Sequence, residues 1–182
     1  MKKTVLTLEK VGIPYMITGS VVSSLQGEPR STHDLDILIT IQKSKVHELL
    51  NAFPPSEFYI DEQAFIDAIN RKGMVNLIDI KTGDKVDFWM LKDEPFDESR
   101  FSRKQLERFM DTEIWVSSPE DTILAKLRWA NLSGGSEKQF IDALRVYEVQ
   151  HEKLDMAYLE KWSIKLGVRP SFERLIGEAE II

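Results

Sequence analysis

The chain has 182 residues, of which 42% are hydrophobic and 30% are charged. This composition is typical of a globular domain and excludes a disordered or fibrous protein. The net charge of -6 opposes non-specific DNA binding, and the absence of cysteine excludes disulfides, thiolate metal sites and cysteine nucleophiles. A metal ion in this protein would therefore be bound by oxygen or histidine ligands.

The apolar runs of the sequence do not predict a membrane protein. They are far shorter than the roughly 20 residues that span a bilayer. The start "MKKTVLTLEK" also lacks the apolar core of a signal peptide. We therefore expect a cytoplasmic protein.

The first part of the chain alternates strands with helices. Glycine and proline end the periodic segments, as at Gly12, Gly19 and Pro54. The elements that we expect are, in chain order, a helix over residues 4–11, a strand over 15–18, a helix over 21–25 capped by Ser20, a strand over 34–40, helices over 43–53 and 61–73, a hairpin of two strands over 74–91 and a strand over 113–117.

From Ser118 onward the pattern is helical. Ser118 is a good N-cap, and proline and acidic residues follow it in the first turn. The helices that we expect cover residues 118–132, 137–150, 155–166 and 170–179. The sequence thus predicts an α/β (α+β) core over residues 1–117, with a mixed β-sheet flanked by helices, and a helical C-terminal extension over residues 118–182 that packs on the core.

Two aspartates stand at the start of the strand over residues 34–40. Asp34 and Asp36 alternate with apolar residues, so both carboxylates lie on one face, with α-carbons about 6.6 Å apart. Such a pair can bind one or two divalent cations. The alternative is that both acids face solvent at a frayed strand end. Leu38 on the same face favours the cation-binding interpretation, because it indicates that this face is covered further along.

Gly19 and Ser20 form a second candidate feature. A glycine after a strand lets the backbone approach a ligand, and a serine at a helix N-terminus offers its hydroxyl and free amides to a phosphate. The alternative is an ordinary turn with an N-cap. The sequence contains neither a Walker lysine pattern nor G-x-G-x-x-G, which disfavours P-loop and dinucleotide-binding folds.

Gly19, Ser20, thirteen intervening residues and then Asp34, Leu35 and Asp36 resemble the signature of the DNA polymerase β-like nucleotidyltransferases. That resemblance implies a third metal-binding acid on a later strand, and "KVDFWML" supplies Asp87 for it. Asp79 in "NLIDIK" is the competing candidate. Lys85, just before Asp87, is expected to be an exposed residue of the hairpin.

Residues 118–150 resemble the helical part of the bacterial AbiEii-like group of nucleotidyltransferases. By that resemblance Lys126 and Asp142 border the nucleotide site, and Arg30 and Thr32 contact phosphate. The structural alternatives are that Lys126 is an exposed helix residue, that Asp142 is a surface acid and that Arg30 pairs with Glu28. Of the three histidines, only His33 lies beside a candidate site residue.

The resemblance implies transfer of a nucleoside monophosphate from an NTP to an acceptor, with release of pyrophosphate. Mg²⁺ or Mn²⁺ would be held by Asp34, Asp36 and Asp87, and Gly19 and Ser20 would hold the triphosphate. The acceptor stays open between RNA, a protein side chain and a small alcohol or amine. The alternative function is an inactive nucleotide- or partner-binding module of a toxin–antitoxin pair, with an antitoxin-like protein as its partner.

Overall fold

The computed structural model describes residues 2–32, 34–109 and 111–181, so the expectation for His33 lies outside the described residues. The chain divides into two compact units. The first unit comprises Met1–Thr18 and Thr32–Val116, and the second comprises Gly19–Ser31 and Ser117–Ile182. The short segment Gly19–Ser31 is therefore grouped with the C-terminal helices, although it lies between two strands of the first unit in the sequence.

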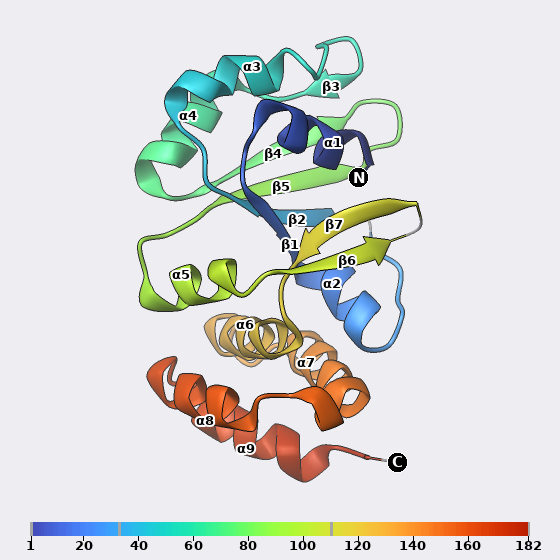
Figure 1. The fold of residues 1–182 in the computed structure, drawn as a ribbon, viewed down its shortest axis with the longest axis vertical. Helices are drawn as coiled ribbons and strands as arrows, with labels where there is room; N and C mark the ends of the chain where they lie inside the picture. Colours follow the sequence, from blue (N-terminus) through green and yellow to red (C-terminus); the bar gives the residue numbers. More distant parts are fainter. Residues whose placement is uncertain (1, 33, 110, 182) are drawn as a thin grey trace. The chain divides into compact units, whose positions relative to one another are not determined.

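The first unit is built on a seven-stranded mixed sheet with the strand order β3-β4-β5-β2-β1-β7-β6 (Figure 1). Strand β2 pairs antiparallel with β1 and parallel with β5, and β4 pairs antiparallel with β5. The strands are β1 (Tyr15–Thr18), β2 (Asp34–Ile39), β3 (Phe58–Tyr59), β4 (Met74–Asp79), β5 (Lys85–Met90), β6 (Gln105–Phe109) and β7 (Thr112–Val116).

One face of the central strands is apolar and buried. Ile37 of β2 lies in register with Phe88 of β5, and Phe88 with Val75 of β4. All three side chains are at most 6% exposed. The ring of Phe65, on helix α4 (Glu62–Arg71), lies 5.8 Å from the ring of Phe88. Because successive residues of a strand point to opposite faces, this apolar packing directs Asp36 and Asp87 to the other face.

The remaining helices of the first unit are α1 (Lys2–Val11), α3 (Val46–Leu50) and α5 (Pro95–Ser102). The single helix expected over residues 43–53 is wrong: a 3-10 turn, η1 (Lys43–Lys45), precedes the short α3, and no side chain caps either element. Strands β3 and β6 and helix α5 were not expected. β6 has almost entirely exposed residues without apolar alternation, which leaves no strand signal in the sequence.

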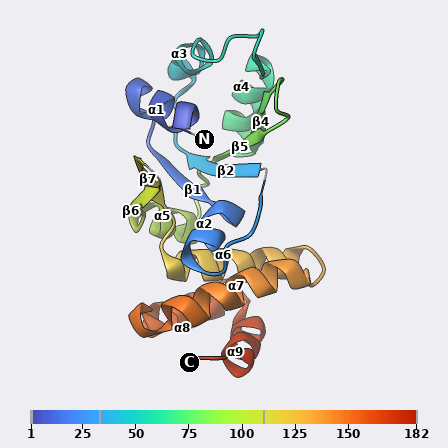
Figure 2. The ribbon, with the colours of Figure 1, turned by 90° about the vertical axis from the view of Figure 1, so that its right-hand side faces the viewer.

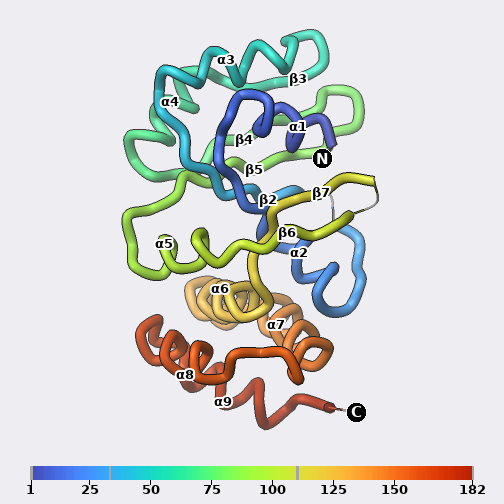
Figure 3. Tube along the Cα trace, in the orientation of Figure 1, coloured from blue at the N-terminus to red at the C-terminus, as the bar shows by residue number. Residues whose placement is uncertain are grey.

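The second unit consists of helices in the described part of the chain (Figure 2). Helices α6 and α7 lie side by side, and α2 packs against both. Figure 3 traces the chain from β1 directly into α2. The elements are α2 (Gly19–Gln26), α6 (Pro119–Leu132), α7 (Glu137–Gln150), the 3-10 turn η2 (His151–Lys153), α8 (Met156–Lys165) and α9 (Arg169–Glu178).

Helix α2 begins two residues before Val21, the first residue of a helix capped by Ser20. Gly19 is its first residue and has φ of 71°, a left-handed conformation that glycine adopts without strain. Ser20 therefore lies within the first turn and is not the N-cap. At the other end of α2, a Cβ on Gly27 would lie 2.8 Å from backbone atoms of Arg145 and Val146 on α7, so only glycine allows this close approach.

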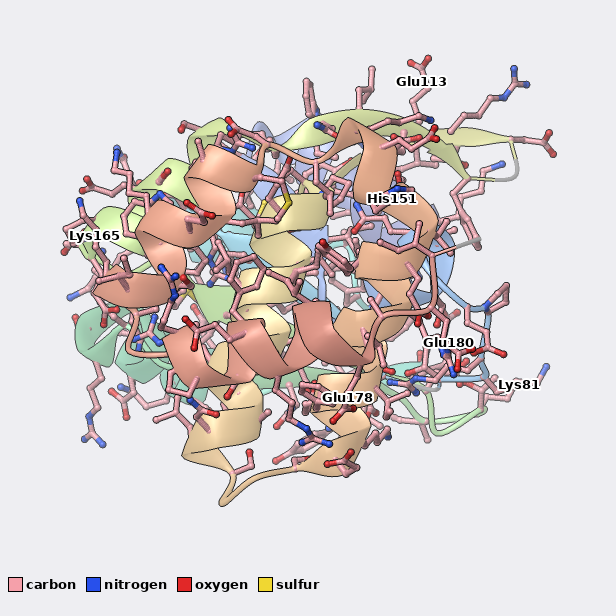
Figure 4. All side chains as sticks on the ribbon, turned by 90° about the horizontal axis from the view of Figure 1, so that it is seen from below. Lys81, Glu113, His151, Lys165, Glu178 and Glu180 are labelled. Atoms are coloured by element: carbon pink, nitrogen blue, oxygen red, sulfur yellow. The ribbon has the colours of Figure 1, made fainter. Side chains whose placement is uncertain are left out.

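The C-terminal helices follow the expected boundaries closely. Ser118 caps α6 by accepting a hydrogen bond from the backbone amide of Asp121, and α7 covers the expected residues. Charged side chains such as Lys165 and Glu178 lie on the outside of α8 and α9 (Figure 4). In the described part of the chain, no helix has the length and apolar character needed to cross a membrane.

Candidate active site

Polar side chains form a row across four adjacent strands of the first unit. Asp36 of β2 lies in register with Asp87 of β5 on one side and with Thr18 of β1 on the other. Asn76 of β4 lies in register with Asp87. Residues opposite each other on neighbouring strands share a face, so Asn76, Asp87, Asp36 and Thr18 line up on the face opposite the apolar core. We call these four residues, with Asp34 and Lys85, the acidic row.

Asp34 and Lys85 extend the acidic row by one further step. They lie in register with each other, two residues before Asp36 and Asp87. The Lys85 Nζ is 3.2 Å from Oδ2 of Asp87 and 3.7 Å from Oδ1 of Asp34. Lys85 therefore bridges two of the three predicted metal ligands, and the expectation of a merely exposed hairpin lysine is wrong.

Neutral donors contact one carboxylate oxygen each of Asp87 and Asp36. The amide of Asn76 donates a hydrogen bond to Oδ1 of Asp87, which is buried. The indole of Trp89 donates to Oδ1 of Asp36 over 3.0 Å. The hydrogen bond to Asp87, with the negative charges of Asp34 and Asp36, raises the pKa of Lys85, so the lysine stays charged at neutral pH.

The three carboxylates suit a divalent cation in their chemistry, since Mg²⁺ and Mn²⁺ prefer hard oxygen donors. Their side chains do not converge: among the described residues, no group of three or more His, Asp or Glu side chains is arranged to hold a metal ion. The contacts of Lys85 give a physical reason, because its ammonium group lies against both Asp34 and Asp87.

Asp79, the competing candidate for the third acid, has a different role in the structure. Its carboxylate accepts hydrogen bonds from the backbone amides of Lys81 and Thr82, and so it stabilises the turn between β4 and β5. Asp87 instead lies in register with Asp36. This arrangement supports Asp87 over Asp79.

The second unit contains a cluster in which two positive side chains surround one carboxylate, so positive charge is in excess, in contrast to the acidic row. Asp142 of α7 accepts hydrogen bonds from Arg30 Nε (2.9 Å), Arg30 Nη2 (2.8 Å) and Lys126 Nζ (2.7 Å). Arg30 Nη2 also donates to the hydroxyl of Ser20 over 2.6 Å. We call Ser20, Arg30, Lys126 and Asp142 the cationic cluster. It brings together two pairs of residues, Ser20 with Arg30 and Lys126 with Asp142, that are far apart in the sequence.

Lys126 and Asp142 of the cationic cluster are buried, whereas Ser20 and Arg30 are partly exposed. The side chains of Lys126 and Asp142 are only 5% and 8% exposed. Burial alone would raise the pKa of Asp142, but the hydrogen bonds from Arg30 and Lys126 outweigh it and hold the pKa below its usual range. The alternatives of an exposed Lys126 and a surface Asp142 are therefore wrong. The alternative pairing of Arg30 with Glu28 is also wrong, because Glu28 pairs with Arg145.

The predicted site residues thus fall into two sets, each within its own unit. Thr32, expected to contact phosphate, belongs to the first unit, where its hydroxyl donates to the backbone carbonyl of Asp34. Sequence reasoning missed Lys85, Asn76 and Trp89. A signal for two of them was present, since Lys85, Asp87 and Trp89 alternate in "KVDFW" and so share a face of β5.

The sequence matches no known family model and no curated protein. Solved structures do show a similar fold. One is a nucleotidyltransferase-like protein from Paracoccidioides brasiliensis, with a TM-score of 0.55 and 17% identity over 100% of this chain and 93% of that chain. Another is the solution structure of the antibiotic-resistance factor ANT(2'')-Ia, with a TM-score of 0.62 and 11% identity over 95% of this chain and 92% of that chain.

The same factor in complex with adenylyl-2"-tobramycin has a TM-score of 0.59 and 12% identity, over 92% of this chain and 95% of that chain. At these identities the likeness shows the fold and not the chemistry. The chain therefore has a nucleotidyltransferase-type fold, as the sequence predicted.

Proposed function

We propose that this protein is a nucleotidyltransferase that transfers a nucleoside monophosphate from an NTP to an acceptor and releases pyrophosphate. The observation that carries the proposal is the register of Asp36 with Asp87 on neighbouring parallel strands, with Asp34 two residues further along the same face. The nucleotidyltransferase-type fold of the solved structures supports it. A specific relation to the AbiEii-like group rests on the sequence resemblance.

In this proposal Asp34, Asp36 and Asp87 hold Mg²⁺ or Mn²⁺. The metal, when bound, neutralises charge on the phosphates and on the leaving pyrophosphate. Asn76 and Trp89 fix the orientation of two of these carboxylates by donating hydrogen bonds to Asp87 and Asp36. By the resemblance, Asp87 is the acid nearest the acceptor, where its buried carboxylate accepts the proton of the attacking group.

The cationic cluster supplies the groups that bind an anion. Ser20 offers a hydroxyl in the first turn of α2, where the free backbone amides also favour negative charge. Arg30 and Lys126 supply two positive charges, of which Asp142 neutralises one. We propose that these groups, with Gly19, bind the triphosphate, and that Asp142 fixes the positions of Arg30 and Lys126.

The acceptor belongs to one of three classes, namely RNA, a protein side chain or a small alcohol or amine. A solved structure of similar fold contains adenylyl-2"-tobramycin, an adenylylated small molecule. That complex makes a small molecule the first acceptor class to test. The net charge of -6 is unfavourable for an RNA acceptor in the absence of bridging cations.

The test is incubation of the full chain with each labelled triphosphate, Mg²⁺ and a cell extract. We expect a label from one triphosphate to appear in one class of acceptor, in macromolecules or in small molecules. Asp36→Asn should abolish the labelling, whereas Asp79→Asn should retain it because Asp79 stabilises a turn. Labelling that persists in Asp36→Asn would contradict the proposal.

A second candidate function is a binding module without catalysis, with an antitoxin-like protein as its partner. The observation that favours it is that each predicted metal ligand already has a partner within the chain, namely Lys85, Asn76 or Trp89. In that case no triphosphate would label any component of the extract. The melting temperature of the protein would also not respond to Mg²⁺ with triphosphate.

A further inference from the structure

The acidic row places three negative charges close together. Asp36 and Asp87 are directly opposite each other on adjacent strands, and Asp34 is two residues from Asp36. Carboxylates this close repel each other unless a cation lies among them. In the structure, Lys85 provides that cation, with its Nζ 3.2 Å from Asp87 and 3.7 Å from Asp34.

The strand register determines that Lys85 is this cation. Lys85 lies opposite Asp34 and two residues before Asp87, so its side chain shares their face of the sheet. Asn76 and Trp89, which donate hydrogen bonds to Asp87 and Asp36, are neutral. Lys85 is therefore the residue that offsets the negative charge at the Asp34 end of the acidic row.

The contact between the ammonium group of Lys85 and Asp34 is exposed enough for another cation to replace the ammonium group. The side chain of Lys85 is 34% exposed, and that of Asp34 is 57% exposed. A lysine ammonium group lies on a flexible stem and is strongly hydrated, so it can turn into water at small cost. A divalent ion and an ammonium group cannot occupy the same place between two carboxylates, because they repel each other.

We infer that Lys85 is the resident cation of the acidic row, and that a divalent metal ion binds between Asp34 and Asp87 only by displacing its ammonium group. This inference rests on the proposed function, since it concerns the metal ligands named there. Lys85 then weakens metal binding and stabilises the protein when no metal is bound. It is a residue that sets metal affinity and not a metal ligand.

The test uses Lys85→Met in the full chain, with Lys81→Met as the matched control. Lys81 is an exposed lysine on the turn between β4 and β5 and is labelled in Figure 4. Its replacement removes the same charge from the same hairpin without touching the acidic row. Mn²⁺ binding is measured by calorimetric titration without triphosphate, so the readout does not depend on activity.

We expect Lys85→Met to bind Mn²⁺ roughly tenfold more tightly than the wild type, because a repelling charge is removed from within a few ångström of the ion. Lys81→Met should bind as the wild type does. Lys85→Arg, which keeps the charge and guards against a folding defect in Lys85→Met, should not bind more tightly than the wild type. Without metal, Lys85→Met should melt at a lower temperature, and Mn²⁺ should raise its melting temperature by more than it raises that of the wild type.

Equal or weaker Mn²⁺ binding by Lys85→Met, relative to the wild type, would overturn the inference. If the labelling assay still shows transfer in that case, the proposed function stands without it. If neither the wild type nor Lys85→Met binds Mn²⁺ at millimolar concentration, both the inference and the metal-binding part of the proposed function are overturned. The inference would also be overturned if Lys81→Met bound Mn²⁺ as tightly as Lys85→Met does. The gain in affinity would then come from the change in net charge and not from the position of Lys85.

Discussion

The two units of the molecule contain charge clusters of opposite sign. In the first unit, three carboxylates of the acidic row face one lysine. In the second unit, two cations of the cationic cluster face one carboxylate, with the hydroxyl of Ser20 beside Arg30. The first set has an excess of negative charge and suits a cation, and the second has an excess of positive charge and suits an anion.

The clusters also differ in how the fold builds them. The acidic row depends on the register of β2, β4 and β5. The apolar side chains on the opposite, buried face of these strands maintain this register. The cationic cluster depends on helix packing, because Arg30 follows α2 and Asp142 lies on α7. Asp34 is 57% exposed and Asp142 only 8%. The Asp34 end of the acidic row is therefore open to exchange of its cation, whereas Asp142 is buried together with Lys126.

The largest effect should come from the acidic row. We expect Asp36→Asn to reduce nucleotidyl transfer by at least about a thousandfold, because an amide cannot neutralise a divalent cation. The fold should persist, since the Asn oxygen can still accept the hydrogen bond from Trp89. Transfer is measured by labelling, and the fold by circular dichroism. Loss of the folded spectrum would remove this variant as evidence, and Asp87→Asn would take its place.

Substitutions in the cationic cluster should lower the free energy of unfolding. We expect Asp142→Asn to lower the free energy of unfolding by about 3 kcal/mol, because it leaves the buried charge of Lys126 without its carboxylate. Lys126→Met should cost less, since Arg30 still pairs with Asp142. Urea unfolding measures both. As a control, Arg174→Gln removes an exposed ion network in the same unit and should leave stability unchanged.

The contribution of Asp142 should also depend on pH. Its pKa is held below the usual range against the opposing effect of burial, so the folded state favours the charged form. Its stabilisation is then fully present above the unfolded pKa of about 3.9 and is lost as pH falls through the lower folded pKa. The difference in unfolding free energy between wild type and Asp142→Asn should be constant from about pH 7 to 5 and shrink below about pH 4. A constant difference at all pH values would contradict the assignment.

The sequence predicted the elements with strong periodicity. Helix α7 and strand β1 have the expected bounds, since hydrophobic spacing and clear end signals agree there. It did not predict β6, whose residues are exposed and whose pairing with β7 is set by tertiary structure. Asp34 and Asp36 were predicted from local alternation, and Asp87 was predicted from the family resemblance. The pairing of Lys85 with Asp34 and that of Asn76 with Asp87 were not predicted, because the register between two strands is not visible in one strand alone.

The packing that supports the cationic cluster can be tested at Gly27. We expect Gly27→Ala to lower the free energy of unfolding by about 1–3 kcal/mol, because the new Cβ would lie 2.8 Å from the backbone of α7. Gly177→Ala is the matched control. Its Cβ meets nothing within 4 Å in helix α9, so it should be neutral or stabilising by up to about 1 kcal/mol. A neutral Gly27→Ala would mean that α2 is not held as closely to α7.

The smallest effect should come from Ser20. We expect Ser20→Ala to raise the KM for triphosphate about fivefold, which is roughly 1 kcal/mol, and to leave kcat nearly unchanged. In the proposed function, the hydroxyl of Ser20 would hold the phosphates equally in the ground state and in the transition state. Arg30 and Lys126 keep their pairing with Asp142 without it. Steady-state kinetics separate the two constants, and Ser171→Ala on α9, outside the cationic cluster, is the control. A fall in kcat with unchanged KM would show that Ser20 acts in the chemical step, and the anion-binding role of the cationic cluster would then be wrong.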